Sequence, residues 1–141
     1  MIDAIVTLLA ADNTLENLLT GGIHNGATVG EISRQNTAAA FDANGEILPC
    51  ALVQLESEVP FGEVRHGAQL FVQIFLYQRY GHGVINQAKD RIYTLLHRQK
   101  VGAPALGNYE TWHANTLLGM HDPGLDCALV TCRYQCFLYR S

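Results

Sequence analysis

Charged side chains are scarce in this sequence of 141 residues. They make up 16% of it, against about 25% in a typical soluble domain. Basic residues are the fewer, with 9 Lys and Arg against 13 Asp and Glu, and the formal net charge is −4. Sequence-independent binding of nucleic acid needs a concentrated positive surface, and the chain has no run of basic residues. The shortage of charge instead favours a surface that is partly covered by other subunits.

Long apolar runs are also missing. No run approaches the roughly 20 residues that a membrane-spanning helix needs, and Met1-Ile2-Asp3 lacks the basic start of a secretory signal. We therefore expect a soluble protein with no membrane partner. A chain of 141 residues fits one domain, 1–141. A domain of this size buries on the order of 68% of its unfolded-state surface, which is enough for an independent core.

Motifs of common active sites are absent too. The sequence contains no Walker loop and no Gly-x-Ser-x-Gly, and its 6 histidines form none of the usual metal-binding spacings. Gly81-His82-Gly83 lacks the third glycine of a dinucleotide-binding fingerprint, because Asn86 stands in its place, so we interpret it as a turn. Asp122, beside His121, is interpreted as a turn residue before it is considered as a general base.

The 4 cysteines give no metal site either. On one strand Cys127 and Cys136 would lie about 30 Å apart, which is too far for a shared coordination sphere. Cys132 and Cys136 share an apolar face with core residues, so reduced, buried thiols are expected. We accordingly expect no catalytic residue, no metal and no cofactor.

What the sequence does contain is a long strand pattern followed by a helix pattern. Apolar residues occupy every second position from Ala68 to Leu76, and this period of two is typical of a strand with one face in a core. The turn at Gly81–Gly83 follows. Apolar residues then recur at helical spacing from Val84, which predicts an amphipathic helix that ends near Lys100.

The other elements follow from shorter patterns. Helices are predicted at Ile2–Leu9 and Leu15–Leu19, a short extended piece at Ile23–Asn25, and strands at Leu48–Glu58, Tyr109–Met120 and Leu125–Tyr139. The predicted fold class is α+β. It has a four-stranded, mostly antiparallel sheet with helices packed on one face, in the order helix, strand, strand, helix, strand, strand.

Residues 26–46 fit no period. A loop of this length within a compact domain is often functional, or disordered until it is bound. The alternative is a β-hairpin with its turn at Asp42-Ala43-Asn44-Gly45, since Asn-Gly is a strong turn signal. Both interpretations of this insertion, a long loop or a hairpin, remain open at this point.

Aromatic residues are mixed with Arg and Gln on the strand faces opposite the predicted core. This composition is typical of a protein interface. A helix such as Ile2–Leu19 could instead cover part of that face, but one short helix cannot cover four long strands, so we favour a subunit interface. The candidate interface residues are Phe71, Gln73, Phe75, Tyr77, Arg79, Arg133, Gln135 and Phe137.

The order of these elements resembles a known family. The N-terminal helices end in Gly21-Gly22-Ile23-His24-Asn25-Gly26, and a strand led by Pro49 follows. The central helix carries Ala88-Lys89-Asp90-Arg91-Ile92-Tyr93-Thr94-Leu95-Leu96-His97. Two long strands, joined at His121-Asp122-Pro123-Gly124, close the chain with Arg133-Tyr134-Gln135-Cys136-Phe137. Over nearly its whole length the sequence resembles the tail-terminator (tail-completion, head–tail joining) proteins of tailed bacteriophages.

The resemblance implies a structural virion protein rather than an enzyme. It implies a ring, a hexamer, at the neck between tail and head, assembled in the host cytoplasm. Its partners would be further copies of itself, the tail tube protein, and the head connector or a head-completion protein. DNA would pass through the lumen only as cargo. Two alternatives stay open: another virion ring protein (head completion or tube-like), and a small-molecule-binding or enzymatic α+β domain with a pocket under Gly81–Gly83.

Overall fold

The computed structural model describes residues 2–60, 67–101 and 108–139. Helices and strands follow one another as α1 (Ile2–Ala10), α2 (Asn13–Leu18), β1 (Ile23–Asn25), α3 (Gly26–Val29), the 3-10 turn η1 (Ala38–Ala40), β2 (Cys50–Pro60), β3 (Gly67–Gln78), α4 (Gly83–Leu96), β4 (Asn108–Asp122) and β5 (Cys127–Tyr139). The α+β class is confirmed. No described helix is long and apolar enough to cross a membrane.

The sheet is mixed and has five strands, in the spatial order β1-β2-β3-β5-β4. β2, β3, β5 and β4 pair antiparallel, as predicted, whereas β1 pairs parallel with Ala51–Val53 of β2. The prediction of four strands was therefore wrong by one. β1 has only three residues, too few for a period to appear in the sequence.

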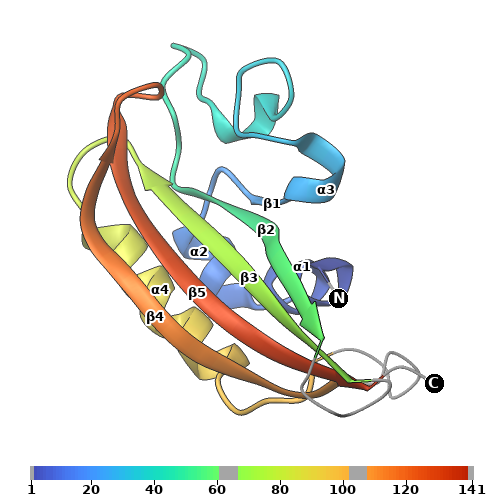
Figure 1. Ribbon diagram of the computed structural model, residues 1–141. Coiled ribbons are helices and arrows are strands. Elements are labelled where there is room, and N and C mark those ends of the chain that lie inside the picture. Colours follow the sequence, from blue (N-terminus) through green and yellow to red (C-terminus); the bar gives the residue numbers. More distant parts are fainter. Residues whose placement is uncertain (1, 61–66, 102–107, 140–141) are drawn as a thin grey trace.

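The helices α1, α2 and α4 pack on one face of the sheet, and Figure 1 shows them behind the long strands. The alternate residues of β3 from Ala68 to Leu76 are buried there, as the period of two predicted. α4 buries Ile85, Ala88, Ile92 and Leu96, a stripe at helical spacing. Burial of each large side chain contributes roughly 1.5–3 kcal/mol, so this layer is the main source of stability.

A strand residue caps α4. The Gly81–Gly83 segment turns the chain, with Gly81 at φ 71°, a conformation that glycine adopts without strain. Gln78 Oε1 at the end of β3 accepts hydrogen bonds from the backbone N–H groups of Val84 (3.0 Å) and Ile85 (3.1 Å). These satisfy two of the donors that a helix start leaves unpaired.

An ion pair ties α2 to α4. Asp12 is the N-cap of α2 and accepts a hydrogen bond from the Leu15 N–H (3.1 Å). Arg91 on α4 donates to both carboxylate oxygens of Asp12, from Nε at 3.0 Å and from Nη2 at 2.7 Å. These hydrogen bonds from Arg91 outweigh burial and lower the pKa of the Asp12 carboxyl.

Residues 26–46 cross to the other face of the sheet. A small hairpin forms where the turn was predicted: Phe41 bridges Ile47, and the Gly45 N–H donates to Asp42 O (3.0 Å). Arg34 holds the turn by donating to Gly45 O from Nε (2.9 Å) and Nη2 (2.6 Å). The rest of the segment consists of α3, η1 and irregular chain, so each of the two open interpretations describes part of it.

Candidate functional site

The candidate site is the sheet face turned away from the three large helices. Side chains of four strands form rows across it, and the middle row reads Gln54, Gln73, Arg133, Asn115 from β2 to β4. The next row contains Phe71, Gln135 and Trp112. We call the surface formed by these two rows, together with Glu56, the open face. Its central side chains are half-buried, so they are accessible in an isolated chain.

Contacts between neighbours hold the open face in one conformation. β2 has a bulge between Leu55 and Ser57, where Glu56 lies, and its Oε2 accepts a hydrogen bond from Arg133 Nε at 2.8 Å. The Arg133 guanidinium also lies 4.2 Å from the centre of the Phe71 ring. A surface preorganised in this way loses little side-chain entropy when a partner covers it.

Of the eight predicted interface residues, seven lie on this side of the sheet, and six of these are half-buried. Phe71, Gln73, Phe75, Arg133, Gln135 and Phe137 are all half-buried there. Arg79 is not on the face: it follows β3, and its Nη1 donates to Asp126 O (2.7 Å) and Asp126 Oδ2 (3.1 Å).

Tyr77 differs from the expectation of a free face. Its side chain points to the predicted side but is only 7% exposed. It belongs to a second, smaller core with Leu52 and Leu129, over which Ile32 and Ile47 of the crossing segment pack. The sequence could not show this cover because residues 26–46 have no period from which a buried side could be inferred.

The two edges of the sheet are the feature that the sequence analysis missed. β1 covers only the first part of β2, and beyond Val53 no described strand pairs with its outer edge. β4 is the strand at the opposite edge, and beyond Thr111, which bridges Gln99, no described strand pairs with it. Exposed apolar side chains mark both edges: Leu55 and Val59 on β2, and Leu117, Leu118 and Met120 on β4. A signal was present, since Leu117-Leu118-Gly119-Met120 places large apolar residues beside a glycine within a strand.

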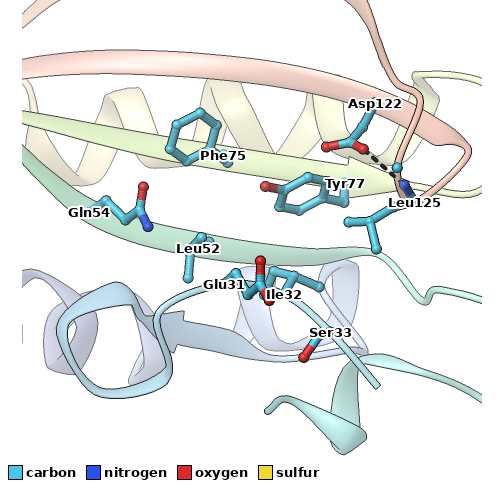
Figure 2. A pocket seen from close by; sticks show the side chains of 10 residues that line it. Glu31, Ile32, Ser33, Leu52, Gln54, Phe75, Tyr77, Asp122 and Leu125 are labelled. Atoms are coloured by element: carbon cyan, nitrogen blue, oxygen red, sulfur yellow. Dashed lines mark hydrogen bonds between the residues drawn. The ribbon is translucent and has the colours of Figure 1, made fainter. Parts of the chain in front are cut away.

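A pocket of about 460 Å³ lies where the crossing segment meets the sheet. Phe75 and Tyr77 stand next to each other on β3, with Asp122 on one side and Glu31 on the other (Figure 2). Leu52 also lines the pocket and adds apolar surface to it. Asp122 Oδ1 accepts a hydrogen bond from the Leu125 N–H (2.9 Å), which confirms that this residue holds the β4–β5 turn.

A second pocket of about 380 Å³ lies beside the Gly81–Gly83 turn. Its polar groups pair largely with one another. Asp126 binds Arg79 (3.1 Å) and lies 3.4 Å from His121, and His82 Nε2 is 3.1 Å from Met120 O. Mutual pairing of this kind holds the turns together, and Arg79 Nε alone is buried without a hydrogen-bond partner among the side-chain atoms of the described residues.

The cysteines behave as core residues. All 4 are unpaired and buried, and burial raises the pKa of the Cys50 thiol to about 12 and that of Cys132 to about 11. The thiolate is the nucleophile and the metal ligand, and it is disfavoured at these positions. In the described parts of the chain no three His, Cys, Asp or Glu side chains gather as metal ligands would.

Comparisons with known proteins find a structural match but no sequence match. No protein-family model matches the chain, and no curated protein sequence matches it. Among solved structures, the chain is similar to one in the "Virion of native gene transfer agent (GTA) particle", with a TM-score of 0.68 and 12% sequence identity. The similarity covers 99% of this chain and 94% of that chain. The chain therefore shares its fold, over almost its full length, with a chain of that virion.

Proposed function

We propose that this protein is a structural component of a phage-like virion. The observation that carries the proposal is the fold shared over almost its full length with a chain of a gene transfer agent virion. The half-buried aromatic, Arg and Gln side chains of the open face add to it, because this composition is common in surfaces that other subunits cover.

In its more specific form the proposal is a tail terminator. The protein forms a ring, a hexamer, at the head-proximal end of the tail, ends the polymerisation of the tail tube, and joins the tail to the head connector or a head-completion protein. DNA passes through the lumen. The formal net charge of −4 suits this role, because a lumen that bound DNA tightly would obstruct passage.

The two sheet edges support a ring. In a ring each subunit presents one patch to one neighbour and a different patch to the other. The outer edge of β4 and the outer edge of β2 beyond Val53 lie on opposite sides of the sheet; most of the first and all of the second pair with no described strand, and exposed apolar side chains lie on both strands. Such edges readily pair with another chain.

The experiment is native mass spectrometry and negative-stain electron microscopy of the purified full chain over a range of concentrations. A closed ring is expected at high concentration. Leu117→Glu, at the β4 edge, should lower the ring population at least tenfold, because a charge would be buried in the contact. Leu8→Glu is the matched control, since Leu8 is an exposed leucine on α1, and it should leave the ring intact.

A chain that stays monomeric at every concentration and on isolated tail tubes would contradict the proposal. Deletion of the gene then separates the terminator from other virion rings. Loss of a terminator should give overlong or unattached tails, whereas loss of a head-completion protein should leave tails of normal length.

A further inference from the structure

The pocket between β3 and the crossing segment is lined by Tyr77, whose hydroxyl is not among the fully buried polar atoms of the described residues. Tyr77 is only 7% exposed, yet its hydroxyl makes no hydrogen bond with any described residue. Burial, followed by the nearby Asp122 carboxylate, raises the pKa of this phenol, so it is neutral and able to donate or accept. A hydroxyl that opens into a pocket and has no partner within the described chain is available to bind a group that enters the pocket.

The charges around this hydroxyl all have one sign. The titratable groups that line the pocket are Tyr77 itself, Asp122 and Glu31, and no Lys, Arg or His is among the lining residues. One oxygen of Asp122 is bound by the Leu125 N–H, and its other oxygen has no described partner. Glu31 is exposed and makes no hydrogen bond or ion pair with a described residue. The pocket thus offers carboxylate acceptors and no cationic donor among its lining residues.

The walls suit the stem of a long side chain. Leu52, Phe75 and Ile32 form apolar surface beside these acceptors. Arg and Lys bury their methylene stems along apolar surface and keep the charged head with polar groups. Aromatic faces such as those of Phe75 and Tyr77 also attract a cation.

We propose that this pocket binds the guanidinium or ammonium group of an Arg or Lys side chain from a neighbouring protein subunit. The carboxylates of Asp122 and Glu31 hold the charge, and the Tyr77 hydroxyl accepts a hydrogen bond from the cation. The assignment of this Arg or Lys side chain to a neighbouring protein subunit rests on the proposed function, because the pocket adjoins the face that assembly would cover. The cationic chemistry of the site does not depend on it.

The test uses a capped peptide and its neutral counterpart. Acetyl-Gly-Arg-Gly-amide and acetyl-Gly-citrulline-Gly-amide are titrated into the isotope-labelled full chain carrying Leu117→Glu, so that no second copy competes for the pocket. We expect the arginine peptide to shift the NMR signals of Ser33, Gly124 and Leu125 in a saturable way. The citrulline peptide should bind at least about tenfold more weakly, because it lacks the charge.

Three variants locate the site. Asp122→Asn keeps the acceptor for the Leu125 N–H but removes the charge, and should weaken the arginine peptide about tenfold. Tyr77→Phe keeps the ring and should weaken it about tenfold, the lower end of the effect of a hydrogen bond to a charged group. Glu16→Gln, an exposed carboxylate on α2 outside the pocket, is the control and should change nothing.

Equal binding of the two peptides, or no shift with either, would overturn the inference. So would saturation by agmatine, a free guanidinium compound, without binding of the capped peptide, because the site would then take a small organic cation. If the chain never forms rings but binds the arginine peptide more tightly than the citrulline peptide, only the proposal of a ring is refuted. If the chain forms rings but binds neither peptide, only the proposal that the pocket binds a cationic side chain is refuted.

Discussion

The two faces of β3 differ in how far they are buried within the chain. Toward the helices, Ile74 and Leu76 are fully buried and make the main core. Gln73 and Phe71 alternate with the core residues along the same strand and lie on its other face. They are half-buried among polar neighbours. The first face is covered by helices of the same chain, and the second is left accessible for a partner to cover. The comparison indicates that stability depends on the first face and assembly on the second.

The ion pairs differ in the same way. Asp12–Arg91, among the helices, has two hydrogen bonds, and the Asp12 side chain is 12% exposed. Glu56–Arg133, on the open face, has one hydrogen bond, and both side chains are about a third exposed. Exposed pairs contribute little to folding, so the open-face pair is better explained by the orientation it gives Arg133.

The largest effect on stability should come from Ile74→Ala. It removes buried methyl groups from the main core, and the free energy of unfolding should fall by about 3–4 kcal/mol. Gln73→Ala, the adjacent residue on the open face, should change it by less than about 0.5 kcal/mol. Urea unfolding followed by circular dichroism measures both. Similar losses for the two variants would remove the distinction between the faces.

Ile47→Ala probes the second core and should have an intermediate effect. Ile47 is 5% exposed and packs in the cluster that covers Tyr77. We expect a loss of about 2 kcal/mol. Hydrogen exchange should speed up at residues 31–47 more than in α4, because the crossing segment can open locally. Uniform acceleration throughout the chain would instead mean that this cluster and the main core unfold as one unit.

Asp12→Ala should cost about 1–2 kcal/mol at neutral pH, since it removes both the N-cap of α2 and the pair with Arg91. The lowered pKa means that the folded chain binds this proton less readily than the unfolded chain. The contribution of Asp12 is therefore complete above the ordinary carboxyl pKa of about 3.9 and is lost as the pH falls towards the folded pKa. Unfolding curves of the two chains should converge in acid. A difference that grew with acidity would reverse this account.

Glu56→Gln should have the smallest effect on folding, below about 0.5 kcal/mol, because the pair is partly exposed. Its effect on assembly should be larger than on folding, since Arg133 loses the carboxylate that orients it. Thermal unfolding measures the first quantity and the midpoint concentration for ring formation measures the second. A stability loss without any shift in that midpoint would assign the pair to the fold alone.

The sequence predicts the regular elements well for a physical reason. β3 and α4 alternate or repeat over many residues, so their buried sides follow from the period itself. β5 behaves likewise, with Val130, Cys132 and Tyr134 buried on one side. β1 was predicted as a short extended piece at Ile23–Asn25, but its place in the sheet was not, because the pairing of a three-residue strand depends on its parallel neighbour, β2, rather than on its own sequence.

The candidate site was predictable only in part. Its strand-face residues share the period of the core and were found with it. The bulge that places Glu56 beside Arg133, and the cover that buries Tyr77, both depend on contacts between distant segments. The cap of α4 by Gln78 is also tertiary, since it requires the chain to turn back over the strand end.

Thiol labelling of Gln73→Cys tests the central claim most directly. The 4 native cysteines are buried and should react slowly, so the introduced thiol at the middle of the open face is read against a low background. Thr7→Cys, on the exposed side of α1, is the matched reference. We expect Gln73→Cys to react in the dissociated chain and at least tenfold more slowly in the ring, while Thr7→Cys reacts equally in both. Equal labelling of Gln73→Cys in the two forms would show that assembly leaves the open face uncovered.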